Sequence, residues 1–169
     1  MNEDNKIEPM FLKLYEEYAD AIFRHCYFRI NNREEATDLT QEVFMKVWRY
    51  MANGEKIDNH RALFYKMANN SVIDYYRRKK PVSLDSLNEA GFDMASNDHQ
   101  KINNLVEAKQ VAQFLNKLEP DYKQALTMRY IDDLSVQEIA DILGERENTV
   151  SVRIHRGLEK IKNLIEHEI

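Results

Sequence analysis

The side chains best suited to recognition chemistry in this chain stand near its C-terminus. Ser151, Val152, His155 and Arg156 recur at helical spacing and share one side of a predicted helix. A guanidinium can serve a guanine base or a phosphate, and hydroxyl and imidazole groups can add further hydrogen bonds. The sequence shows no glycine-rich phosphate loop, metal cluster or nucleophile–base set beside them. These residues therefore predict a DNA-reading surface and not an enzyme.

A helix-turn-helix pattern around these residues accounts for how such a surface would be positioned. Ser135 and Glu138 have the spacing of a capping box, and Gly144 suits the left-handed residue that ends a first helix. Asn148 or Thr149 is predicted to cap the second helix. The buried side of that second helix is predicted to be a stripe at helical spacing, made of Val150, Ile154, Leu158 and Ile161.

Composition predicts an all-α fold. The chain has 169 residues with only four Gly and three Pro, and these are the residues that helix interiors tolerate least. A single cysteine, Cys26, fits a reducing compartment. There is no signal-peptide pattern and no bilayer-length apolar run, so a cytoplasmic protein without membrane insertion is expected. We expect no cofactor and no metal, and interpret His25 and Cys26 as ordinary helix residues.

Charge is unevenly distributed along the chain. The net charge of −5 is unusual for a protein that binds DNA tightly on its own. Residues 60–80 nevertheless carry six basic side chains and one acidic, whereas residues 81–100 carry four acidic side chains and no Lys or Arg. The distribution predicts a weak or conditional DNA binder that needs a carrier.

Periodicity and breaker residues predict two small helical domains. Helices are predicted over residues 8–30, 33–51, about 60–79, about 104–118 and 121–131, followed by the helix-turn-helix at 134–158. Residues 52–59 are a predicted loop, and Asp132-Asp133 is interpreted as an exposed turn. A flexible acidic linker is predicted between the domains, with boundaries at 1–80, 81–103 and 104–169.

The third predicted helix mixes aromatic side chains with polar groups and ends in four consecutive cations, Arg77 to Lys80. Aromatic rings beside cations suit single-stranded DNA, because bases stack on the rings while cations hold phosphates. The alternative is that the cations merely close a helix C-terminus. In that interpretation the core stripe consists of Leu63, Phe64, Met67, Ile73 and Tyr76.

The second predicted helix carries an acidic and amide face edged by large aromatic side chains. Asp38, Gln41 and Glu42 share one side by their spacing, and Phe44 and Trp48 lie at its margin. Such a face suits a protein partner. The alternative is a solvated helix face whose aromatic residues turn into the core.

These segments, in this order, resemble the sigma factors of bacterial RNA polymerase, and the small extracytoplasmic-function (ECF) type most closely. The resemblance covers residues 8–165. Asp38-Leu-x-Gln-Glu-x-Phe-x-Lys-x-Trp48 is similar to the region that docks on the polymerase clamp helices. Ala68-x-Asn70 and Asp74-Tyr75-x-Arg77-Arg78 are similar to the region that reads and opens the minus-10 element. Leu134-Ser-x-x-Glu-Ile-Ala and Thr149-Val150-x-x-Arg153-Ile154-x-Arg156 are similar to the region that binds the minus-35 element.

The resemblance implies an alternative sigma factor that directs RNA polymerase core to specific promoters and helps to open the minus-10 DNA. Its partners would be the clamp helices and flap of the polymerase core, and promoter DNA. The implied polymerase-binding residues are Asp38, Gln41, Glu42, Phe44 and Trp48. The implied minus-10 residues are Asn70, Asp74, Tyr75, Arg77 and Arg78. The implied minus-35 residues are Arg129, Thr149, Ser151, Val152, His155 and Arg156.

Two further properties of such proteins bear on this chain. They capture a flipped base at the turn that corresponds to residues 52–59 here, and unstacking that base restricts activity to easily opened sequences. They are often held inactive by an anti-sigma factor, of which this sequence carries no direct sign.

The chain departs from the family's pattern at three positions. Ser151 and Leu158 stand where many relatives have a basic residue, and Asn69 stands where relatives often have arginine. Arg153 has two open roles, a DNA contact or an ion pair within its domain. The alternative function is a stand-alone helix-turn-helix regulator with an N-terminal sensing or dimerisation domain, which leaves the clamp-like and aromatic–basic segments without a purpose.

Overall fold

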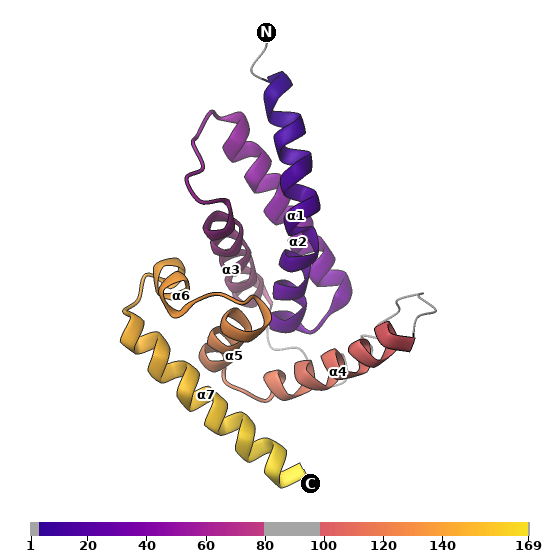
Figure 1. Ribbon diagram of the computed structural model, residues 1–169, viewed down its shortest axis with the longest axis vertical. Coiled ribbons are helices and arrows are strands. Elements are labelled where there is room, and N and C mark those ends of the chain that lie inside the picture. Colours follow the sequence, from indigo (N-terminus) through magenta and orange to yellow (C-terminus); the bar gives the residue numbers. More distant parts are fainter. Residues whose placement is uncertain (1–3, 80–98, 169) are drawn as a thin grey trace.

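The computed structural model describes the backbone of residues 4–79 and 99–168, with side chains for residues 6–79 and 107–167. All regular structure within these ranges is helical, as predicted (Figure 1). The predicted acidic linker falls mostly on residues 80–98, outside the described residues. Helix α4 begins at His99, so the helix starts earlier than the predicted position near residue 104.

Three long helices form the N-terminal domain, α1 (Asp4–Ile30), α2 (Arg33–Ala52) and α3 (His60–Arg78). Asparagine side chains start the second and third of them. The side chain of Asn32 accepts a hydrogen bond from the Glu35 amide at 3.0 Å, and that of Asn59 accepts one from Ala62 at 3.1 Å. Such caps satisfy amides that have no partner within the helix, and they account for the sharp boundaries after α1 and before α3.

Aromatic packing fills the core of the N-terminal domain. Phe44 lies between Phe11, Tyr15 and Phe64, with ring centroids 4.8 to 6.2 Å apart. Tyr18 stacks on Phe64 at 4.7 Å. The predicted core stripe of α3 is partly wrong, because Tyr76 is 47% exposed while the buried residues are Phe64, Tyr65, Ala68, Asn69, Ser71 and Val72.

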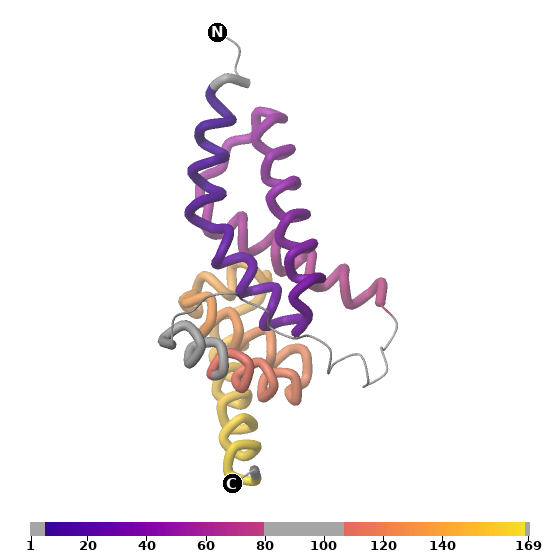
Figure 2. The backbone as a smooth tube through the Cα atoms, turned by 90° about the vertical axis from the view of Figure 1, so that its right-hand side faces the viewer, coloured from indigo at the N-terminus to yellow at the C-terminus, as the bar shows by residue number. Residues whose placement is uncertain are grey.

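The C-terminal domain consists of α4 (His99–Asn116), α5 (Pro120–Leu126), the π-helical turn η2 (Thr127–Ile131), α6 (Val136–Leu143) and α7 (Glu147–Glu168). Figure 2 shows it against one end of the N-terminal helices, with α7 running away from them so that the start of α1 and the end of α7 lie far apart. Pro120 stands in the first turn of α5, where its missing amide costs nothing.

The π-helical turn brings an acidic side chain inward. The Asp132 amide donates to the Thr127 carbonyl at 3.0 Å, five residues back, which gives the chain one residue more than an α-helical turn. Asp132 is consequently only 6% exposed. The prediction that Asp132-Asp133 forms an exposed turn is therefore wrong for Asp132, although Asp133 is exposed with a positive φ of 56°.

Buried polar side chains join the two domains. His25 Nδ1 of α1 donates to Asp132 Oδ2 at 2.5 Å, with both side chains at most 1% exposed. Asn69 Oδ1 of α3 accepts from Arg29 Nη1 of α1 and from Gln124 Nε2 of α5, both at 2.8 Å. Burial lowers the pKa of Arg29 to about 10. His25 is therefore not an ordinary helix residue, because it pairs with the other domain.

Candidate nucleic-acid interface

The helix-turn-helix has the predicted cap at its first helix. The Ser135 side chain accepts from the Glu138 amide, and the Glu138 carboxylate accepts from the Ser135 amide, both at 3.1 Å. Gly144 ends α6 in the left-handed region with φ 66°. The second helix differs from the prediction, since α7 begins at Glu147 and neither Asn148 nor Thr149 precedes it as a cap.

One side of α7 packs closely on α5 at Gly157. A Cβ built on Gly157 would stand 3.1 Å from Leu126 Cδ1. Val150 and Ile154 are buried on the same side, whereas Leu158 is 40% exposed. The predicted stripe was therefore right at its start and wrong at Leu158, because the helix turns Gly157 and not Leu158 towards α5.

The opposite side of α7 is open and polar. Thr149, Ser151, His155 and Arg156 are exposed, and Val152 is 39% exposed. His155 Nε2 lies 3.3 Å from Glu159 Oε1, an exposed pair that contact with DNA can replace. The hydroxyl, imidazole and guanidinium groups on this side are exposed and can donate hydrogen bonds to an outside partner.

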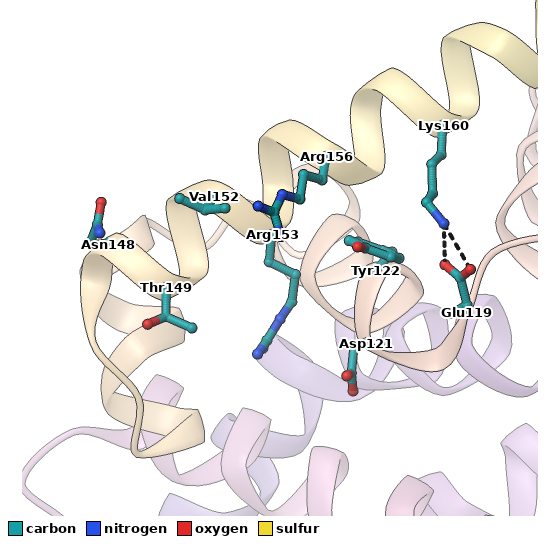
Figure 3. A pocket seen from close by; sticks show the side chains of 9 residues that line it. All are labelled: Glu119, Asp121, Tyr122, Asn148, Thr149, Val152, Arg153, Arg156 and Lys160. Carbon is teal, nitrogen blue, oxygen red and sulfur yellow. Dashed lines mark hydrogen bonds and ion pairs between the residues drawn. The ribbon is translucent and has the colours of Figure 1, made fainter.

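A hollow of about 580 Å³ runs between α7 and the start of α5 (Figure 3). Lys160 crosses its end and pairs with both Glu119 oxygens at 2.8 Å. The remaining lining residues are Asp121, Tyr122, Asn148, Thr149, Val152, Arg153 and Arg156. Glu119 and Asp121 stand among the three cations, so acidic side chains offset much of the positive charge of the lining.

Arg153 and Arg129 support the domain rather than lying free on its surface. Arg153 Nη1 lies 2.8 Å from Glu145 Oε2 with 18% of its side chain exposed, which confirms the ion pair within the domain. Arg129 Nη1 donates to the Leu134 carbonyl at 3.1 Å, and its guanidinium lies over the Tyr130 ring at 6.0 Å. Arg129 is half-buried, so it braces the turn before α6 and leaves only part of its guanidinium for DNA.

The last turns of α3 present the predicted cations and aromatic rings. Asn70, Arg77 and Arg78 are exposed, and Arg77 Nη1 lies 3.8 Å from Asp74 Oδ1. Lys79 Nζ lies 4.8 Å from the centre of the Tyr75 ring, which is half-buried. Rings and cations thus lie together at one end of α3, a combination that suits the stacking of single-stranded bases.

A second hollow, of about 290 Å³, lies at the turn between α2 and α3. We call it the turn pocket. The N-terminal domain supplies most of its wall, namely Tyr50, Lys56, Ile57, Asp58, Asn59, Ala62, Leu63 and Lys66. Asp141 and Ile142 of α6 complete it from the other domain. The flanking α3 residues Ala62, Leu63 and Lys66 were missed from the sequence, although their helical spacing from Asn59 places them beside the predicted loop.

The predicted polymerase-binding residues of α2 divide between surface and core. Asp38 and Gln41 are exposed, and Glu42 is half-buried and pairs with Lys46 at 3.1 Å. Trp48 is 39% exposed. Phe44 is only 4% exposed, so it supports this surface from beneath and presents no area of its own to a partner.

The described residues contain no His, Cys, Asp or Glu cluster that could hold a metal ion. No helix in the described part of the chain is long and apolar enough to cross a membrane.

Comparisons with known proteins match both halves of the chain. A model described as Sigma-70 region 2 matches residues 14–82, and one described as Sigma-70, region 4 matches residues 108–161. The ECF RNA polymerase sigma factor SigW of Bacillus subtilis is 30% identical over 168 residues, covering 92% of this chain and 88% of SigW. The B. subtilis RNA polymerase sigma factor YlaC is 29% identical, with 97% and 95% covered.

Solved structures share the fold. CnrH, solved in complex with the cytosolic domain of CnrY, aligns with a TM-score of 0.72 and 20% identity over 96% of this chain and 91% of that chain. The sigma factor RpoE of Bartonella quintana, solved in complex with the anti-sigma factor NepR, aligns with a TM-score of 0.67 and 18% identity over 92% and 96%. The two sigma regions match this chain in order, and SigW is similar over nearly its whole length. The chain therefore belongs to the ECF sigma factors of RNA polymerase.

Proposed function

We propose that this sigma factor grips its promoter at two points, with α7 on the minus-35 duplex and α3 with the turn pocket on the minus-10 strand. The observation that carries the proposal is the division of α7 into a side packed on α5 and an exposed polar side. A helix held in this way can enter the major groove while its domain stays folded. Ser151, Val152, His155 and Arg156 would touch bases or phosphates, with Thr149 at the helix start.

The minus-10 contacts would come from the exposed end of α3 and from the turn pocket. Asn70, Arg77 and Arg78 are open to solvent, and Tyr75 offers a ring beside Lys79. The turn pocket has the volume to accept part of a flipped base. Lys56 and Lys66 would attract a nucleotide, while Asp58 and Asp141 in the same lining oppose that attraction. Asp74 would hold Arg77 in place through the pair already present.

The α2 face would bind the polymerase clamp through Asp38, Gln41, Glu42 and Trp48, with Phe44 supporting Trp48 from the core. A modest set of cations on α7 and a net charge of −5 mean that few phosphates are neutralised, so DNA affinity without polymerase is expected to be low. The polymerase supplies the missing affinity by linking the two DNA-binding domains. We also propose an anti-sigma factor as a partner, because RpoE was solved with one, and a cytoplasmic site of action.

In vitro transcription with bacterial polymerase core and a promoter library tests this function. Full-length chain is expected to select a subset of promoters that share two short elements. Gln41→Ala/Glu42→Ala should abolish transcription and co-purification with core while leaving the helical circular dichroism unchanged. Lys13→Ala, on an exposed position of α1 outside the α2 face, is the control.

The stand-alone regulator makes the opposite prediction. It would bind a promoter duplex tightly and specifically at physiological salt without polymerase, and the Gln41→Ala/Glu42→Ala variant would bind equally well. A gel shift with the selected promoters separates the two functions. Tight specific binding by the chain alone would contradict the proposed two-point grip.

A further inference from the structure

One side chain on the exposed face of α7 differs in character from its neighbours. Val152 is 39% exposed, while Ser151 and Arg156 near it are polar and exposed. Among the side chains described in the first half of α7, Val152 is the only large apolar one that is exposed. Single exposed apolar side chains are ordinary on protein surfaces, but this one stands among the residues proposed to enter the major groove. Packing within its own domain does not account for its apolar character.

The helix holds Val152 in a fixed place. Val150, two residues before it, is fully buried, and Ile154, two residues after it, is only 8% exposed. Residues two apart in an α-helix are turned by about 200° from one another, so the burial of these two side chains directs Val152 outwards. A β-branched side chain in a helix has one strongly preferred rotamer. The isopropyl group is therefore presented to a partner with little side-chain entropy left to lose.

The surroundings of Val152 are open to an outside partner. Figure 3 shows it on α7 among the side chains that line the hollow, together with Thr149 and Arg156. Arg156 has no ion-pair partner among the described residues, whereas the other two cations of this lining are paired with carboxylates. This part of α7 thus combines an apolar side chain with a guanidinium that the domain itself does not use.

The chemistry of the major groove limits what an isopropyl group can contact there. Base edges present hydrogen-bond donors and acceptors, and the only methyl group among the unmodified bases is that of thymine. An isopropyl group placed against a donor or acceptor leaves that group without a partner, which costs free energy. Placed against a methyl group, it removes apolar surface from water on both sides of the contact. A methyl group is therefore the partner that suits Val152.

The spacing along α7 restricts where that methyl group stands. Arg156 follows Val152 by four residues, which is about 6 Å along the helix axis. Neighbouring base pairs are about 3.4 Å apart. Where the helix lies along the groove, the two side chains therefore reach positions about two base pairs apart.

We propose that Val152 reads the 5-methyl group of one pyrimidine in the minus-35 element, about two base pairs from the site of Arg156. The inference rests on the proposed function for the placement of α7 in the minus-35 duplex, and it names a chemical group recognised there. The ligand is the methyl group rather than the whole base, so 5-methylcytosine is read in the same way as thymine. Since this contact neutralises no phosphate, added salt leaves it unchanged.

Exchange of thymine for uracil removes the methyl group alone and tests the contact. Promoters selected by the full-length chain with polymerase core are synthesised with each minus-35 thymine replaced in turn by deoxyuridine. At one thymine, the concentration of chain needed for half-maximal run-off transcription should rise about fourfold, the ratio expected for the burial of one methyl group. The other thymines should give ratios near one.

Cytosine and 5-methylcytosine at that same position separate the methyl group from the base that carries it. With guanine opposite in both promoters, the concentration needed with 5-methylcytosine should be about fourfold lower than with cytosine. Val152→Ala should abolish both ratios while its circular dichroism melting curve shows a folded chain. Leu158→Ala, which shortens another exposed apolar side chain of α7, should keep both ratios. Arg156→Ala should weaken transcription from all four promoters and also keep both ratios, because its contact does not involve the methyl group.

Three results would overturn the methyl contact. One is the absence of any minus-35 thymine at which uracil raises the required concentration. Another is a thymine-to-uracil ratio that Val152→Ala leaves at its wild-type value. The third is a ratio that 5-methylcytosine and cytosine fail to reproduce, which would assign the effect to the shape of the A·T pair. Promoter selection that needs Arg156 but no methyl group would reject this inference alone, whereas absence of transcription from every promoter would contradict the proposed function.

Discussion

Replacement of Lys123 by methionine is expected to stabilise this chain at neutral pH. The Lys123 side chain is 7% exposed, and its amino group donates to Asn116 without a paired carboxylate among the described residues. Burial, and secondarily the charge of Arg29, lowers its pKa from 10.5 to about 7. A charged ammonium in this position opposes folding, and methionine keeps most of the packing while removing the charge.

The magnitude follows from the difference in proton affinity between the two states. A lysine that titrates near 7 when folded and near 10.5 when unfolded costs about 5 kcal/mol in its charged form. Methionine also loses the hydrogen bond to Asn116, which lowers the free energy of unfolding by about 1 to 2 kcal/mol. The free energy of unfolding of Lys123→Met at pH 7 should therefore exceed that of wild type by about 3 kcal/mol. The unfolded chain binds the Lys123 proton more tightly than the folded chain does, so the free energy of unfolding of wild type rises with pH between 7 and 10.5. Below pH 7 the whole cost of the buried charge is present.

Urea unfolding followed by far-ultraviolet circular dichroism at pH 7 and pH 9 measures this effect. The free energy of unfolding of the wild-type chain should rise by about 2 kcal/mol over that interval, and that of Lys123→Met should stay nearly constant. Lys162→Met, at an exposed position on α7, controls for the change of residue type and should retain the wild-type slope. Equal slopes for wild type and Lys123→Met, or a less stable Lys123→Met variant at pH 7, would refute the reasoning.

Three further predictions concern the C-terminal domain. Arg156→Ala should weaken minus-35 recognition by about 1 to 3 kcal/mol if the guanidinium reads a base, and an unchanged promoter preference in run-off transcription would exclude that role. Ser135→Ala should cost about 1 kcal/mol of unfolding free energy by removing the cap of α6, measured by urea denaturation. Gly157→Leu should cost about 1 to 3 kcal/mol because its Cβ alone would stand 3.1 Å from Leu126, whereas Leu158→Ala, at the exposed neighbour, should change stability little.

Features with a local physical cause could be predicted from the sequence. Ser135, Glu138 and Gly144 act within a single helix and its ends, so their types and spacing were enough to predict the capping box and the left-handed terminus. The exposed face of α7 was predictable for the same reason, since helical spacing alone separates Arg156 from Val150. The prediction of a helix start was wrong where no capping side chain marks it. Helix α7 begins at Glu147, about one turn before the predicted buried stripe.

Features that depend on the second domain could not be predicted. The buried face of α3 includes Asn69 and Ser71, which periodicity assigns to solvent, because partners from outside α3 satisfy them. Gln124 supplies one such partner from the C-terminal domain and Lys46 another at 3.2 Å. The pairing of His25 with Asp132 spans 107 residues of sequence, and the π-helical turn that directs Asp132 inward has no simple sequence signal.

The carboxylate of Glu138 has a consequence for hybrid proteins made by exchanging domains. One of its oxygens caps α6 and the other accepts from Arg61, so a transplanted C-terminal domain would keep its own cap and stay folded in a foreign chain. The bond to Arg61 would survive only if the host presented an arginine at the same place in its third helix. Hybrids whose host lacks that arginine are therefore expected to keep α6 folded while the two domains lose one of the contacts between them.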